Sequence, residues 1–124
     1  MATIEVLLVD EDTEMLELTE TFLERESDEI AVTTEQSANA AVEQVADGAF
    51  DCVVSDLRMP EMSGAELCKR VHESRPDLPV FLFTAATDED VSEQIGDADV
   101  VDVIRKGTGT DHYTELARGI ETAV

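Results

Sequence analysis

Positively charged residues are scarce in this 124-residue chain. Eight Lys and Arg face thirty Asp and Glu, for a formal net charge of −22, and lysine occurs only as Lys69 and Lys106. Such a surface repels phosphate backbones, which argues against direct nucleic-acid binding. We interpret the acid excess as adaptation to a salt-rich cytoplasm, because about 1 M salt shortens the Debye length to about 3 Å and screens the repulsion. An ordinary acidic protein is the alternative.

Cysteines and long apolar runs are also few. Cys52 and Cys68 lie far apart without clustered histidines, which argues against a zinc site and favours two core thiols in a reducing cytoplasm. No apolar run is long enough to cross a bilayer, and Met1 leads directly into a strand pattern rather than a signal peptide. We therefore expect a cytoplasmic protein that does not engage the membrane.

Two patterns alternate regularly along the chain. Short apolar runs typical of buried strands cover 4–9, 30–34, the stretch that ends before Asp56, 79–84 and 100–104. Apolar residues at helical spacing follow each run, over 15–23, 38–45, 65–75, 88–96 and 110–123. Strict alternation requires a parallel sheet with right-handed crossovers and helices on both faces. The sequence predicts one α/β domain over residues 1–124, a doubly wound five-stranded (βα)5 sheet.

Asp56 is the most informative single residue. An apolar run stops at this carboxylate, and a turn containing Pro60 and Gly64 follows before the next helical pattern begins. The carboxyl end of a strand in an open α/β sheet is where ligands bind. A carboxylate there can act as a nucleophile or a metal ligand, although a merely solvated strand-end acid is the alternative.

Other polar residues end neighbouring strands and should meet Asp56 at the same edge. They are Asp10-Glu11 after the first run, Thr84 at the end of the fourth and Lys106 after the fifth. Each has an ordinary alternative: chance acidity for the pair, a helix cap or edge hydroxyl for Thr84, and a surface cation for Lys106. Together, three carboxylates could bind Mg²⁺, while a hydroxyl and an ammonium suit a phosphoryl group. We interpret the edge as a phosphate-accepting site.

The chain resembles the receiver domain of two-component response regulators over nearly its whole length. The matching motifs, in order, are Asp10-Glu11, Asp56-Leu57-Arg58-Met59-Pro60 with Gly64 following, Thr84-Ala85, and Lys106. The resemblance implies the flavodoxin-like strand order 2-1-3-4-5. It also implies that the protein is a phosphorelay switch rather than an enzyme, apart from phosphotransfer to Asp56 and hydrolysis from it.

The same resemblance implies a role for each matched residue. Asp56 would receive phosphate from a histidine kinase or a phosphotransfer protein. The Mg²⁺ ligands would be Asp10, Glu11, Asp56 and the backbone carbonyl of Arg58. The groups on the phosphoryl oxygens would be Thr84, the amide of Ala85, and Lys106. Output would pass to a protein effector or a fused output domain, and the chain is either a stand-alone receiver or one module of a longer protein.

Three positions depart from the family pattern. Glu11 stands where Asp is more usual, so its extra methylene could alter Mg²⁺ binding. Val103 occupies a position where many members carry an aromatic residue that swings inward as the threonine moves. Gly107 replaces a proline that takes a cis bond in the family, and Gly107-Thr108-Gly109 should form a softer loop.

The predicted switch follows from charge. A phosphorylated Asp56 gains roughly −1.5 to −2 charges, which Mg²⁺ and Lys106 offset while Thr84 turns in to donate a hydrogen bond. Movement of Thr84 should alter the face near the last two helices, so we expect amide exchange to change mainly across 84–106.

Two rival functions remain open from the sequence. Asp10-Glu11-Asp12-Thr13 resembles the nucleophile motif of haloacid-dehalogenase phosphatases, but Glu14 does not fit that motif and Lys106 follows the later acids rather than preceding them. The other rival is a receiver fold that no longer switches and serves as a docking module. The departures at Glu11 and Val103 motivate it.

Overall fold

A computed structural model describes residues 3–48, 50–107 and 111–124. Its five strands are β1 (Ile4–Val9), β2 (Ile30–Glu35), β3 (Cys52–Ser55), β4 (Val80–Thr84) and β5 (Asp102–Arg105). Its five helices are α1 (Thr13–Glu26), α2 (Ala38–Asp47), α3 (Gly64–Ser74), α4 (Asp88–Ile95) and α5 (Asp111–Ala123). Strands and helices alternate strictly along the chain, as the sequence predicts.

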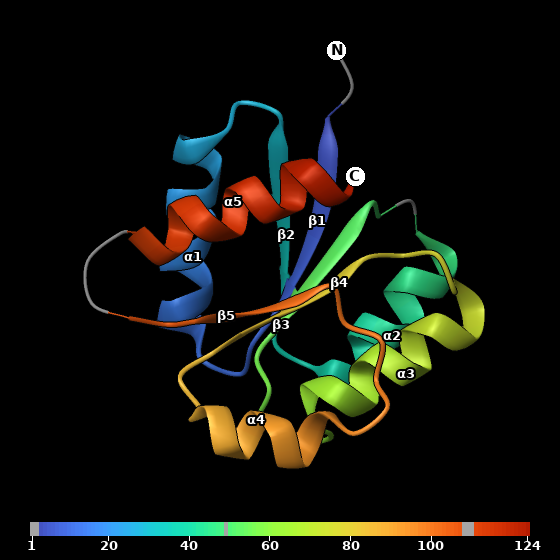
Figure 1. Cartoon of the computed structure of the whole chain (residues 1–124). Coiled ribbons are helices and arrows are strands. Elements are labelled where there is room, and N and C mark those ends of the chain that lie inside the picture. The colour runs from blue at the N-terminus through green and yellow to red at the C-terminus, as the bar shows by residue number, and fades with distance from the viewer. Residues whose placement is uncertain (1–2, 49, 108–110) are drawn as a thin grey trace.

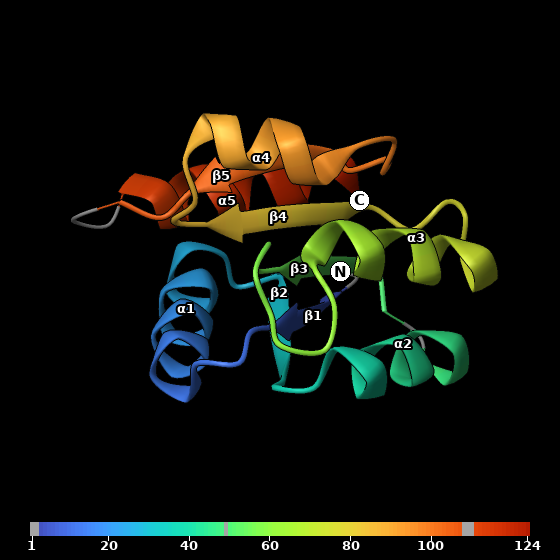
Figure 2. The ribbon, with the colours of Figure 1, turned by 90° about the horizontal axis from the view of Figure 1, so that it is seen from below.

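The strands form one parallel sheet in the order β2-β1-β3-β4-β5. This confirms the predicted strand order and the doubly wound fold. Figure 1 shows α1 and α5 together on one side of the sheet, with α2 and α3 on the other. Figure 2 shows α4 lying along β4 and β5, away from α2. A parallel sheet brings the carboxyl ends of its strands to one edge, and this is the edge that carries the candidate site.

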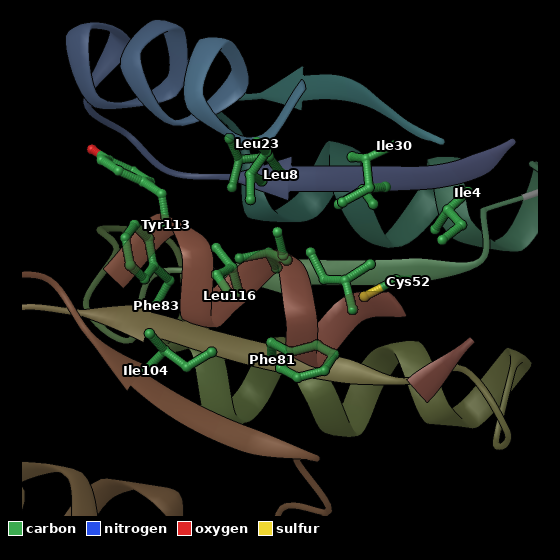
Figure 3. Close-up of a cluster of buried hydrophobic side chains, with 14 of the residues drawn as sticks. Ile4, Leu8, Leu23, Ile30, Cys52, Phe81, Phe83, Ile104, Tyr113 and Leu116 are labelled. Atoms are coloured by element: carbon green, nitrogen blue, oxygen red, sulfur yellow. The ribbon is translucent and has the colours of Figure 1, made fainter. Parts of the chain in front are cut away.

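The central strand β1 supplies both cores because successive side chains point to opposite faces. Ile4, Val6 and Leu8 join the cluster beneath α1 and α5 shown in Figure 3, whereas Leu7 and Val9 join the cluster beneath α2 and α3. Both cysteines are free thiols buried in these cores, as predicted. Burial raises the pKa of the Cys68 thiol to about 11, so it is protonated at neutral pH.

Serine, threonine and aspartate side chains cap the N-termini of four helices. The N-caps of α1, α2, α3 and α4 are Asp12, Ser37, Ser63 and Thr87, and each side chain accepts a backbone N–H from the first turn of its helix. Thr110, the predicted start of the last helix, and Thr108 and Gly109 of the predicted soft loop lie outside the described residues. No helix of the described chain is long and apolar enough to span a membrane.

The fifth strand differs in its bounds from the prediction of 100–104. β5 covers Asp102–Arg105, and Val101 before it is 53% exposed. The sequence pattern counted Val100 and Val101 as strand residues because they are apolar. In the structure Val100 instead packs beside Ala98 on the core under α2 and α3. Tertiary packing of the preceding loop therefore delays the strand by two residues.

Candidate functional site

Three side chains from the ends of three strands meet at the carboxyl edge of the sheet. Asp10 follows β1, Asp56 follows β3 and Lys106 follows β5. The Lys106 Nζ lies 2.9 Å from Asp10 Oδ2 and 3.5 Å from Asp56 Oδ2. The side chains are only 6%, 17% and 13% exposed for Asp10, Asp56 and Lys106. One ammonium therefore offsets two nearly buried carboxylates, and low exposure strengthens both interactions.

Each carboxylate is fixed by a backbone amide as well. The N–H of Asp12 donates to Asp10 Oδ1 at 3.0 Å, and the N–H of Leu57 donates to Asp56 Oδ1 at 2.7 Å. In both residues one oxygen is held by the main chain while the other lies toward Lys106. The arrangement orients two carboxylate oxygens on a common cation.

Thr84 ends β4 beside this group. Its side chain is nearly buried, and its Oγ1 accepts the N–H of Ala86 at 3.1 Å. The carbonyl of Thr84 accepts the N–H of Lys106 at 2.9 Å, so the backbone links the predicted hydroxyl to the predicted ammonium. Ala85 between them is exposed. Since Oγ1 is used as an acceptor here, the hydroxyl proton is still available for donation.

Glu11 is exposed, unlike the buried Asp10 beside it. Over the described residues, no three acidic, histidine or cysteine side chains form a group that could hold a metal ion. Asp10 and Asp56 are nevertheless hard oxygen donors that approach the same point, and Mg²⁺ is commonly bound by one or two carboxylates with several waters. The donor set fits Mg²⁺, with Asp10 and Asp56 as the side chains that the structure brings together.

Gly64 makes the turn after Asp56 possible. Its N–H donates to the Leu57 carbonyl at 2.7 Å, which closes the loop just before α3. A Cβ at this position would lie 2.4 Å from the Asp56 carbonyl oxygen and 2.7 Å from Leu82 Cδ2. Only glycine allows this approach, so Gly64 sets how α3 begins against the end of β3.

Comparison with known families accounts for this geometry. Residues 6–118 match the sequence model of the response regulator receiver domain. The chain belongs to this family. The family match sets aside the haloacid-dehalogenase alternative, and receiver domains are signalling modules of two-component systems.

Curated relatives of this receiver domain are longer regulatory proteins. FixJ of Bradyrhizobium diazoefficiens is 29% identical over 119 residues, which cover 96% of this chain and 56% of FixJ. The nisin biosynthesis regulatory protein NisR of Lactococcus lactis is 31% identical over 91 residues, which cover 73% of this chain and 39% of NisR. The receiver domain thus spans about half or less of these relatives.

Solved receiver structures share the fold. The response regulator TrrA of Thermotoga maritima, solved in complex with Mg(2+)-BeF, is 23% identical with a TM-score of 0.84, covering 98% of this chain and 100% of TrrA. The receiver domain of a sensor histidine kinase from Pseudomonas aeruginosa, with a magnesium ion coordinated in its active site cleft, is 20% identical with a TM-score of 0.83. It covers 97% of this chain and 99% of that one.

The loop between β3 and α3 of this receiver domain makes contacts that the sequence did not reveal. The Arg58 guanidinium forms an ion pair with Asp90 of α4. On the other side, Glu61 accepts hydrogen bonds from Ser37 Oγ at 2.9 Å and Asn39 Nδ2 at 2.8 Å, at the start of α2. The bond from Ser37, followed by that from Asn39, lowers the pKa of Glu61. The loop is therefore tied to helices on both sides.

Aromatic side chains near Lys106 are a second feature that the sequence did not reveal. Lys106 Nζ lies 5.6 Å from the centroid of the Phe83 ring, which stacks on His112 with centroids 5.5 Å apart. Tyr113 packs against both rings and stacks on Phe22 of α1, as part of the cluster in Figure 3. Val103 is half-buried. The aromatic contacts at this end of the sheet thus come from β4, α5 and α1 rather than from β5.

Gly107 follows the ammonium-bearing residue without the family's proline. It is exposed, and no cis peptide bond occurs in the described chain.

Proposed function

We propose that this receiver domain accepts a phosphoryl group on Asp56 from a histidine kinase or a phosphotransfer protein. The observation that carries the proposal is the position of Asp56. It is nearly buried at the end of β3, with one oxygen held by the Leu57 amide and the other 3.5 Å from Lys106. A carboxylate fixed in this way is held in one orientation beside a cation, and phosphoryl transfer depends mainly on positioning and charge neutralisation.

In the transfer step, an Asp56 carboxylate oxygen attacks the phosphorus of a phosphohistidine. The new O–P bond gives an aspartyl phosphate, while the P–N bond breaks and its electron pair returns to the imidazole nitrogen. Water later attacks the acyl phosphate and releases inorganic phosphate, which restores the carboxylate. The protein thus accepts the phosphoryl group, and its own hydrolysis step sets how long the phosphorylated form lasts. It turns over no external substrate.

We assign the remaining charge neutralisation to Lys106 and to a bound Mg²⁺. Asp10 and Asp56 would hold the ion, with Glu11 and the Arg58 carbonyl as the further ligands that the resemblance implies. The ion would supply positive charge to the phosphoryl oxygens as they approach two carboxylates. The magnesium seen in the related TrrA and Pseudomonas aeruginosa receivers supports this assignment.

Thr84 and Ala85 complete the proposed phosphoryl site. The Thr84 hydroxyl now accepts the Ala86 N–H. Turning toward a phosphorylated Asp56, it would donate its proton to a phosphoryl oxygen, and the exposed Ala85 would offer its amide to another. Lys106 would exchange Asp10 for the phosphoryl group, to which its charge is better matched.

The downstream partner is proposed to be a protein domain rather than nucleic acid. The net charge of −22 opposes direct contact with a phosphate backbone. The longer curated relatives support an output domain in the same or another chain. The change at Asp56 would reach that partner through the face near α4 and α5.

The test is intact-mass spectrometry after incubation with acetyl phosphate and Mg²⁺ in concentrated KCl. We expect the mass of one phosphoryl group to be added to the wild-type chain and not to Asp56→Ala. Omission of Mg²⁺ should abolish the gain, whereas Asp51→Asn, which changes a carboxylate at the opposite end of β3, should leave it intact. A folded wild-type chain that gains no mass in excess Mg²⁺ would contradict the proposal.

A non-switching docking module is the second candidate because Glu11, one of the expected metal ligands, is exposed. A Glu11→Asp variant separates the two candidates. If Glu11 weakens the site, this variant should gain phosphate where the wild type does not.

A further inference from the structure

Helix α4 is attached to the rest of the molecule by charged groups rather than by a buried apolar face. Among its residues with described exposure (89–95), none is buried, and Val91 and Ile95 are half-buried. Arg58 pairs with Asp90 in the first turn. Beyond the C-terminal end of α4, Lys69 Nζ of α3 lies 2.7 Å from Asp97 Oδ1. Each of these cations belongs to a set of only eight, so their use around one helix is conspicuous.

Arg58 occupies a particular place in this arrangement. It lies two residues after Asp56, on the loop that Gly64 closes, while its guanidinium reaches Asp90. It is therefore a side chain that joins the phosphoacceptor loop directly to α4. The pair is exposed, with side chains 58% and 37% accessible. Exposed ion pairs are weak, so a stronger anion nearby can displace Asp90 from the guanidinium.

Asp90 has a second partner available if it loses Arg58. It is the third residue of α4 after the N-cap Thr87, whose Oγ1 accepts the Asp90 N–H at 3.2 Å. In a capping box, the acid at this position also accepts the backbone N–H of the N-cap residue. Asp90 is instead turned to Arg58. The Asp90 carboxylate consequently has two alternative partners: the Arg58 guanidinium on the loop, or the backbone N–H of Thr87 at the start of α4.

We propose that the Arg58 side chain is a positioning residue that couples phosphorylation of Asp56 to α4. The inference rests on the proposed function. A phosphoryl group adds roughly −1.5 to −2 charges and three acceptor oxygens two residues from Arg58. The planar guanidinium binds phosphate oxygens in a bidentate manner, so it leaves Asp90 for the phosphoryl group. The Asp90 carboxylate then accepts the backbone N–H of Thr87, and α4 loses its ion pair with the loop.

The experiment is amide hydrogen exchange of the full chain, with and without acetyl phosphate and Mg²⁺, at the lowest salt that keeps it folded. Asp90→Asn removes the partner of Arg58 without touching Asp56 or its ligands. Lys69→Gln is the matched control, because it breaks the exposed ion pair with Asp97, just past the C-terminal end of α4, which does not involve the loop that follows Asp56. Asp90→Glu is the conservative variant.

We expect unphosphorylated Asp90→Asn to exchange 88–95 roughly two- to five-fold faster than the wild type, the range that loss of an exposed ion pair implies. Phosphorylation should add little further change to α4 in this variant, although it accelerates α4 in the wild type. Asp90→Glu should restore the wild-type response, and Lys69→Gln should keep it. The loss of the phosphorylation response distinguishes coupling from a merely structural contact.

Two results would overturn the inference. One is an amide exchange rate of α4 in unphosphorylated Asp90→Asn that equals the wild-type rate. The other is a full phosphorylation response in that variant. Intact mass on the same samples reports whether Asp56 is modified. A wild-type chain that gains no phosphate contradicts the proposed function, whereas modification of both chains with equal α4 responses contradicts only the role of Arg58.

Discussion

Helices α4 and α5 flank the same strand, β5, but are held to the sheet by different forces. Four residues of α5 are buried in the core shown in Figure 3: Tyr113, Leu116, Ala117 and Ile120. The described part of α4 buries none and is tied down by Arg58–Asp90 and, just past its end, Lys69–Asp97. Burial is insensitive to small changes in charge, whereas exposed ion pairs are not. A switch that works by charge can therefore move α4 while α5 stays in place.

The first prediction compares one apolar truncation in each helix. Leu116→Ala should lower the free energy of unfolding by about 2–5 kcal/mol, because it leaves a cavity beneath α5. Ile95→Ala in α4 should cost only about 1 kcal/mol, because that side chain is half-exposed. Denaturant unfolding in concentrated KCl measures both. Equal losses would mean that α4 is held by packing after all.

The second prediction uses salt to separate the two helices. Raising the salt from about 0.1 M to about 1 M shortens the Debye length from about 10 Å to about 3 Å. The global stability should rise as the repulsion of a −22 chain is screened. Exchange in α4 relative to α5 should nevertheless quicken, roughly two-fold or more, because the ion pairs beside α4 are screened too. Parallel protection of both helices would contradict the comparison.

The third and smallest effect concerns pH and α5. Burial, opposed in part by Asp111, lowers the pKa of His112 below its ordinary 6.5, and its ring stacks on Phe83. At pH values between the lowered folded pKa and 6.5, this imidazole binds a proton more often in the unfolded chain than in the folded one. The free energy of unfolding therefore rises with pH across that window. Replacing His112 by Gln should flatten this slope in denaturant titrations, whereas His72→Gln serves as the comparison outside the aromatic cluster.

Much of the site follows from topology and was accessible from sequence. Asp10, Asp56, Thr84 and Lys106 stand where strands end, and a parallel sheet brings those ends to one edge wherever the helices settle. The roles of these residues and of Glu11 remain predictions. The position of Glu11 could not be read from the sequence, because a loop residue next to a strand end can face either the site or solvent.

The ties of the β3–α3 loop could not be predicted for a different reason. The chain contains thirty acidic residues that could pair with Arg58, and several helix N-termini that could donate hydrogen bonds to Glu61. Their partners, Asp90 and the Ser37–Asn39 turn, are selected by the path of the loop, which no periodic pattern encodes. The late start of β5 has a similar origin, because Val100 is apolar but packs on the core beneath α2 and α3 rather than in the strand.

The scarcity of lysine makes this receiver domain unusually simple to label. Of its two side-chain amines, Lys106 is only 13% exposed and is engaged by Asp10, whereas Lys69 is 48% exposed. An amine-reactive fluorophore should therefore choose Lys69 between them, in the weakly alkaline conditions that its raised pKa, due to the Asp97 hydrogen bond, requires. The dye would sit on α3, five residues of which are buried, and face the segment that joins α4 to β5. A label on this side chain, with no engineered cysteine, would report motion beside the helix whose described residues bury no side chain.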